Sequence, residues 1–165
     1  MSALTAGTIA PPFDLPALDG SRFSLEHALR RGPVLAIFFK ISCPVCQYAL
    51  PYFERIYTNY GGKKISIVGI SQNDKEESTA FAKHYRVTFP ILLEDTKRFP
   101  VSNAYGLTNV PTAFWIAEDG QIELSSVGWV RQHFEELVRL AASASGIDPK
   151  PLLQPSEQVA DFRAG

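Results

Sequence analysis

The feature that most constrains this chain is a pair of cysteines, Cys43 and Cys46, close behind a run of six apolar residues. They are the only two cysteines among 165 residues. The run Val34–Phe39 has the length and composition of a strand that is buried on both faces, as central parallel strands are. From Pro44 to about Tyr60, apolar residues recur at helical spacing. The cysteines therefore lie at a strand-to-helix junction, which predicts an α/β fold with this strand inside the sheet.

Further strands and helices alternate along the chain, and their connections favour a mixed central sheet with helices on both faces. The turn residues Leu18-Asp19-Gly20 between two short alternating stretches predict an N-terminal β-hairpin. Strands are expected at residues 65–70, 90–93, 112–116 and 121–127, and helices at residues 25–30, about 74–85 and 131–142. Residues 118–120 form a turn signal, so the last two strands are expected to be antiparallel.

The length suits one domain, which would bury roughly 68–70% of the surface of the unfolded chain. Residues 1–12 are small, polar and proline-containing and are interpreted as an N-terminal arm. Residues 13–145 carry the periodic segments and form the predicted domain. Residues 146–165 contain three prolines and no periodicity, which is typical of a C-terminal tail.

Composition excludes several classes of protein. Sixteen Lys and Arg against seventeen Asp and Glu give a net charge of −1, so no basic patch predicts a nucleic-acid or anionic-membrane partner. Two cysteines are too few for a disulfide scaffold. The longest apolar run, six residues, is far below the ~18 that a membrane-spanning helix needs. No basic segment followed by an apolar one is visible at the start, so we expect a cytoplasmic protein, or an exported one if a leader has been removed. We also expect the protein to be a monomer.

The spacing of the cysteines has a chemical meaning. Two intervening residues at a helix start can bring the two Cα atoms within the ~4.4–6.8 Å that a disulfide requires. The helix macrodipole favours a thiolate on Cys43, and Pro44 in the first helical position sacrifices no backbone hydrogen bond. The backbone amides of Val45 and Cys46 are then free to face the Cys43 sulfur. We predict a redox-active pair in which Cys43 is the nucleophile and Cys46 resolves the mixed disulfide.

Three other interpretations of the pair are weaker. A zinc site needs two more ligands, and the three histidines lie in three different predicted helices. A passive disulfide that closes so short a loop stabilises little. Two unrelated buried thiols would have to meet at this junction by coincidence. A Cys-x-x-Cys beside a βαβ pattern favours the redox interpretation. No metal or organic cofactor is then expected, because the dithiol itself carries two electrons.

From about Pro12 to Ala142, the sequence resembles the thioredoxin-fold superfamily, and most closely the TlpA/ResA-like thiol–disulfide oxidoreductases within the redoxin, AhpC/TSA-like group. The motifs that carry the resemblance are Phe13-Asp14-Leu15, the segment from Phe38 to Cys46, Val68-Gly69-Ile70-Ser71, Tyr105-Gly106-Leu107 and Val110-Pro111-Thr112. The resemblance implies a three-layer α/β/α thioredoxin-like domain with a central mixed sheet and an N-terminal hairpin extension. It also implies exchange of a Cys43–Cys46 disulfide with the thiols of partner proteins.

The resemblance assigns further site residues. It implies that Pro111 follows a cis peptide bond and packs opposite the cysteines, and that the backbone of Val110 pairs with the bound partner. Lys40, Pro44 and Val45 are expected to support the active site.

The sequence departs from thioredoxin at several positions. Ser42 replaces the tryptophan before the first cysteine, and Ile37 replaces the buried acidic residue. Deprotonation of Cys46 must then use water or another group, for which Lys40, Glu94 and Asp95 are candidates. Pro44-Val45 replaces Gly-Pro, which predicts a couple more oxidising than the ~−270 mV of thioredoxin.

Two alternative functions share this fold. A peroxiredoxin needs a threonine three residues before its cysteine and an arginine across the site, where this chain has Lys40 and Pro111. A copper-binding metallochaperone uses cysteines separated by three residues and a histidine, but here the spacing is two and Pro111 occupies the histidine position.

Overall fold

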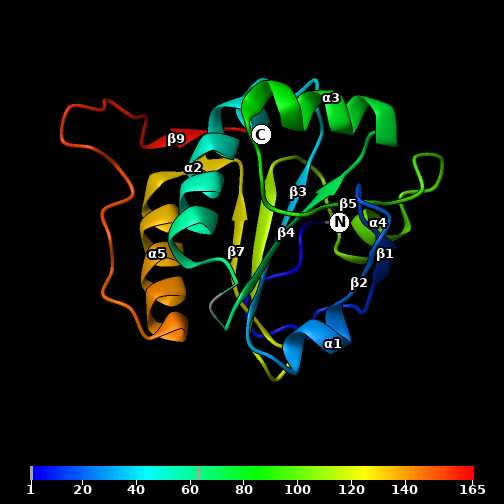
Figure 1. Ribbon diagram of the computed structural model, residues 1–165, viewed down its shortest axis with the longest axis horizontal. Helices are drawn as coiled ribbons and strands as arrows, with labels where there is room; N and C mark the ends of the chain where they lie inside the picture. The colour runs from blue at the N-terminus through cyan, green and yellow to red at the C-terminus, as the bar shows by residue number, and fades with distance from the viewer. Residues whose placement is uncertain (1, 63) are drawn as a thin grey trace.

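The central sheet has five strands, in a computed structural model that describes residues 2–62 and 64–165 (Figure 1). In spatial order they are β5 (Ile91–Leu93), β4 (Ser66–Ser71), β3 (Val34–Phe39), β6 (Thr112–Ile116) and β7 (Ile122–Val127). Strands β3, β4 and β5 pair in parallel, whereas β6 pairs antiparallel with both β3 and β7. The sheet is therefore mixed, as the sequence predicts.

Strand β3 lies at the centre of the sheet and is buried on both faces. Its six side chains alternate between two hydrophobic cores because successive residues of a strand point to opposite faces. Leu35, Ile37 and Phe39 join one core, and the other three join the second core. This double burial explains why the strand is apolar throughout and carries no alternating pattern.

Helices cover both faces of the sheet and complete the predicted α/β/α layers. One core contains side chains of α2 (Pro44–Tyr60), α3 (Lys75–Tyr85) and α5 (Arg131–Ser145), and α1 (Leu25–Leu29) and α4 (Pro100–Ala104) contribute to the other. Helix α2 packs on α5 through Phe53 and Phe134, whose ring centroids are 4.6 Å apart. Within the described residues, no helix combines the length and apolar character needed to cross a membrane.

The N-terminal region lies along both edges of the sheet. Strands β1 (Asp14–Pro16) and β2 (Arg22–Ser24) form the predicted hairpin, and the backbone of Leu18 donates to Ile91 of β5 at 3.0 Å. Earlier in the chain, Gly7 donates to the carbonyl of Ile122 and the Ile122 amide donates to Thr8, both at 2.8 Å. The domain boundaries at residues 12 and 146 stay predictions, and residue 1 lies outside the described part of the chain.

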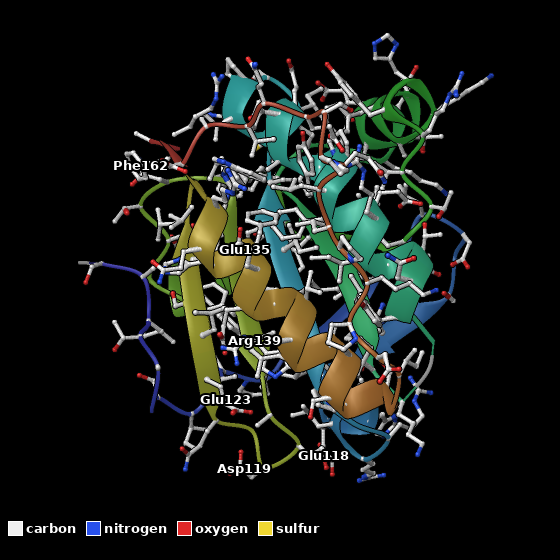
Figure 2. The ribbon with its side chains drawn as sticks, turned by 90° about the vertical axis from the view of Figure 1, so that its left-hand side faces the viewer. Glu118, Asp119, Glu123, Glu135, Arg139 and Phe162 are labelled. Atoms are coloured by element: carbon white, nitrogen blue, oxygen red, sulfur yellow. The ribbon has the colours of Figure 1, made fainter. Side chains whose placement is uncertain are left out.

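The last twenty residues run back along α2 and α5 (Figure 1). Leu152 is buried in the core beside these helices, and Glu157 pairs with Arg55 of α2 at 2.7 Å. The chain ends in strand β9 (Phe162–Arg163), which pairs with β8 (Trp129–Val130). Figure 2 shows Phe162 at the opposite end of the molecule from the β6–β7 turn. Neither two-residue strand was predicted, because so short a segment has no periodicity.

Candidate redox site

Cys43 is the N-cap residue of α2, four residues beyond the end of β3. Its backbone is extended (φ −87°, ψ 116°), and its sulfur accepts a hydrogen bond from the Cys46 amide at 3.2 Å. Pro44 occupies the first helical position, where its missing N–H costs no intrahelical bond. The first turn of the helix therefore directs an N–H group at the sulfur and stabilises negative charge on it.

The two sulfurs differ in accessibility. Cys43 retains 9% exposure, whereas Cys46 is completely buried, and both are free thiols. Burial raises the pKa of Cys46 well above its ordinary value, and a backbone hydrogen bond with Lys40 and the nearby Lys40 ammonium oppose this rise only in part. A partner can therefore reach Cys43 first, while Cys46 is held as a neutral thiol beneath it.

The loop before β6 faces Cys43 from across the site. The Val110–Pro111 peptide bond is cis, which matches the geometry that the resemblance implies. The Cys43 thiol donates to the carbonyl oxygen of Val110 at 3.3 Å. The structure thus brings Cys43 close to both Cys46 and Val110, and Pro111, the residue before β6, is buried.

The segment before Cys43 is held by two side chains that the sequence analysis did not place in the site. The amide of Ile41 donates to the Asn73 side chain at 3.0 Å, and the carbonyl of Ile41 accepts from the Gln47 side chain at 2.9 Å. Asn73 directly precedes Asp74, the N-cap residue of α3. It also follows β4, which is parallel to β3. Because the carboxyl ends of parallel strands meet at one edge of a sheet, this position in the sequence could have placed Asn73 near the segment that follows β3.

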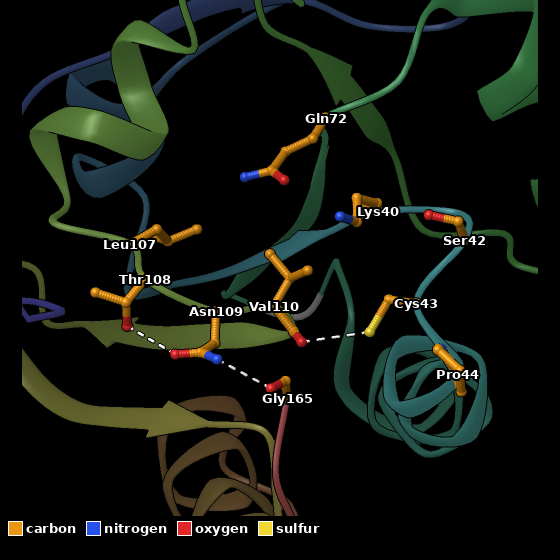
Figure 3. A pocket seen from close by; sticks show the side chains of 10 residues that line it. All are labelled: Lys40, Ser42, Cys43, Pro44, Gln72, Leu107, Thr108, Asn109, Val110 and Gly165. Carbon is orange, nitrogen blue, oxygen red and sulfur yellow. Dashed lines mark hydrogen bonds between the residues drawn. The ribbon is translucent and has the colours of Figure 1, made fainter.

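A pocket of about 420 Å³ opens beside Cys43 (Figure 3). Among the described residues that line it, Lys40 has the only charged side chain; the others are Ser42, Cys43, Pro44, Gln72, Leu107, Thr108, Asn109, Val110 and Gly165. Figure 3 shows Lys40 and Gln72 on one side of the opening and Asn109 and Gly165 on the other. Its volume lies within the ~300–1,000 Å³ typical of ligand sites.

The remaining predicted residues are placed differently. Val45 does not line the pocket and packs against the core instead. Glu94 is buried and accepts hydrogen bonds from the backbone amides of Val101 and Ser102 at the start of α4. Asp95 accepts from the amide of Lys97. Of the three candidates for assisting Cys46, Lys40 is the one that acts to lower the pKa of its thiol.

No group of three or more His, Cys, Asp or Glu side chains that could hold a metal ion occurs in the described part of the chain.

The fold and the N-capped cysteine pair define a thioredoxin-fold protein with a redox-active dithiol. The chain belongs to the AhpC/TSA family, whose model matches residues 6–125, more than half of its length. It is also 30% identical over 141 residues to "Thiol-disulfide oxidoreductase ResA" of Halalkalibacterium halodurans, covering 84% of this chain and 78% of that protein. The chain is a thiol–disulfide oxidoreductase.

Solved structures agree with the fold. The thioredoxin domain of a thiol-disulfide oxidoreductase from Bacteroides vulgatus is 19% identical and superposes with a TM-score of 0.75, over 84% of this chain and 99% of that one. Peroxidoxin BcpB from Mycobacterium tuberculosis is 20% identical, with a TM-score of 0.68 over 87% of this chain and 97% of that one. At these identities the likeness shows the shared thioredoxin-like architecture alone.

Proposed function

We propose that this chain exchanges disulfides with partner proteins, with Cys43 as the attacking thiol and Cys46 as the resolving thiol. The observation that carries the proposal is the difference between the two sulfurs. Cys43 opens into the pocket, accepts a hydrogen bond from the amide of Cys46 and donates one to Val110. Cys46 is sealed beneath it with its pKa raised by burial.

The exchange proceeds in two steps, in which atoms, protons and electrons are conserved. The Cys43 thiolate attacks one sulfur of the partner disulfide, so that a mixed disulfide forms and the other partner sulfur leaves as a thiolate, which takes up a proton. Cys46 then loses its proton and attacks Cys43, which releases the second partner thiol and closes the Cys43–Cys46 disulfide. The partner gains two electrons and two protons. In the opposite direction, the disulfide of this chain oxidises a partner dithiol.

The residues around the pair support these steps. The Cys46 amide stabilises negative charge on the Cys43 sulfur as it attacks or leaves. The Lys40 ammonium favours the thiolate of Cys46 during resolution. The carbonyl of Val110 and the adjoining pocket provide a surface against which a partner backbone can pair. No metal or organic cofactor takes part in this proposal, because the two sulfurs carry both electrons.

The direction of exchange depends on the reduction potential of the pair. Pro44-Val45 between the cysteines supports a potential above the ~−270 mV of thioredoxin. Equilibration of the chain with glutathione buffers of known ratio measures it directly. A value at or below that of thioredoxin would contradict this part of the proposal.

The function is tested by insulin reduction with dithiothreitol as the electron source. The wild-type chain is expected to accelerate precipitation of the insulin B chain, whereas Cys43→Ser should reduce the rate to that of dithiothreitol alone. Ala80→Ser, an equally small change at an exposed position of α3, is the matched control and should keep the wild-type rate. Equal activity of Cys43→Ser and wild type would remove Cys43 from the mechanism.

Two alternatives from the sequence are decided by separate assays. Consumption of hydrogen peroxide well above the rate of a free thiol, in a thioredoxin-coupled assay, would support a peroxidase. Spectroscopic titration with Cu(I) tests copper binding. The expected cytoplasmic location and monomeric state stay predictions, which cell fractionation and size-exclusion chromatography test.

A further inference from the structure

Residues 160–165 form a segment, here called the strap, that is paired with the body of the protein. Within it, Phe162–Arg163 pairs antiparallel with Trp129–Val130. The amide of Arg131 extends this pairing by donating to the carbonyl of Asp161 at 2.9 Å. The strap is thus held in a fixed register immediately before α5.

Side chains tie the strap to the helix that carries the cysteines. The amide of Ala160 donates to the hydroxyl of Tyr48 at 3.2 Å, and the Ala160 carbonyl accepts from the indole N–H of Trp129. The guanidinium of Arg163 lies 4.3 Å from the centroid of the Tyr48 ring, within the range of a cation–π interaction. Tyr48 is two residues beyond Cys46, so these contacts place the strap beside the first turn of α2, which carries both cysteines.

At two positions the strap passes so close to the body that only glycine fits. A Cβ atom on Gly128, whose φ is +74°, would lie 2.4 Å from the carbonyl oxygen of Arg163. A Cβ atom on Gly165 would lie 2.5 Å from the carbonyl oxygen of Val110. The Asn109 side chain donates to the Gly165 carbonyl at 3.0 Å and holds the last residue there (Figure 3).

The Val110 carbonyl therefore has Cys43 and Gly165 as close neighbours. The proposed function has an extended partner chain pair with Val110, and that chain would need part of the space that Gly165 occupies. The other side of the pocket, next to Lys40 and Gln72, stays open (Figure 3). A small disulfide can reach Cys43 from this side without moving the strap.

We propose that the strap is a specificity determinant, which admits small-molecule disulfides to Cys43 and must be displaced before an extended protein chain can bind. This inference rests on the proposed function and adds the class of substrate that the resting site accepts. It assigns no chemical step to the strap, so the exchange chemistry at Cys43 and Cys46 is the same for both substrates.

Two substitutions in the full chain loosen the strap. Gly165→Val places a branched side chain where even a Cβ atom meets the Val110 carbonyl, and Arg163→Ala removes the cation from Tyr48. Arg139→Ala is the matched control, because Arg139 is an exposed arginine on α5, away from the strap (Figure 2). Release of the strap is measured in Gly165→Val by the rate at which trypsin cleaves after Arg163.

The readout is the ratio of two rate constants measured with the reduced protein, one for insulin and one for hydroxyethyl disulfide. We expect this ratio to rise at least fivefold in Gly165→Val, to rise less in Arg163→Ala, and to stay at the wild-type value in Arg139→Ala. Tryptic cleavage after Arg163 should accelerate in Gly165→Val.

Several results would overturn the proposal. One is an unchanged ratio in Gly165→Val despite faster cleavage, and another is an equal rise of both rate constants. Cleavage that is not accelerated would refute the close approach on which the inference depends. Failure of the proposed function is recognised separately, because Cys43→Ser would then react with both disulfides as fast as wild type.

Discussion

Cys43 and Cys46 lie at the two ends of the first turn of α2, and their identical side chains have opposite environments. Cys43, at the N-cap, has its sulfur beside a pocket and hydrogen bonds to the Cys46 amide and the Val110 carbonyl. Cys46, one turn into the helix, is fully buried and its pKa is raised. The spacing of the cysteines makes them neighbours, but the order in which they react follows from burial. Variants that alter either sulfur or its surroundings test that difference.

The largest effect is expected from Cys46→Ser. The serine hydroxyl cannot attack the mixed disulfide, so turnover with insulin should be lost while one partner molecule stays linked to Cys43. Intact mass spectrometry under non-reducing conditions detects the adduct. Cys43→Ser is the reciprocal control and should form no adduct, because its remaining sulfur is buried. Adducts of equal yield in both variants would show that the two sulfurs are equally accessible.

The next largest effect is on the pH dependence of resolution. Burial raises the pKa of Cys46, so its thiol is neutral near pH 7 and its thiolate fraction grows about tenfold per pH unit while the pH stays below that pKa. The rate at which the mixed disulfide resolves should therefore rise with pH between about 6 and 9 without reaching a plateau. Rapid-quench kinetics of the isolated intermediate measure it. A plateau near pH 7 would mean that Cys46 is ionised there.

A smaller effect is expected from Lys40→Met. Without the ammonium, the pKa of Cys46 should rise further, since Lys40 acts to lower it. Because Lys40 is exposed, we expect resolution to slow by only about two- to fivefold at pH 7. The first step, attack by Cys43, should change less than resolution does. Lys40→Arg keeps the charge and should resolve at close to the wild-type rate, and a similar loss in both variants would refute the electrostatic role.

The smallest effect is expected from loosening the segment before Cys43. Asn73→Ala removes the acceptor of the Ile41 amide, which should lower the free energy of unfolding by about 1 kcal/mol. Urea denaturation of the reduced protein measures this change. Asn73→Asp keeps an acceptor oxygen at the same position and should retain most of the stability. An unchanged midpoint in Asn73→Ala would show that the hydrogen bond contributes nothing measurable.

The parts of the molecule that the sequence predicts are those with a local signal. Strand β3 is a continuous apolar run, α2 has helical periodicity and a proline in its first turn, and the cysteine spacing marks the junction between them. The cis bond before Pro111 was expected only through the resemblance, because a proline before a strand has no local property that distinguishes it.

The parts that the sequence did not predict depend on contacts between distant residues. Gly165 closely approaches the Val110 carbonyl, and the Asn73 side chain accepts one hydrogen bond from the Ile41 amide. Single contacts of this kind leave no periodic pattern in the sequence. The tail looked unstructured because its prolines and polar residues exclude a helix, yet a two-residue strand and a few side chains hold it in place. Tyr48 of α2 accepts a hydrogen bond from the Ala160 amide and Tyr52 donates one to Glu157, so two aromatic side chains of this helix contact the tail.

The hydrogen bonds of the N-terminal region have a consequence for association between molecules. An exposed edge strand offers unpaired N–H and C=O groups to another chain and is a site of aggregation. Here the Leu18 amide reaches β5 at one edge of the sheet, and the chain near Gly7 and Thr8 pairs with the start of β7 at the other. The first twenty residues thereby limit the backbone that either edge could offer to a neighbouring molecule, and they protect the sheet from growing by strand addition.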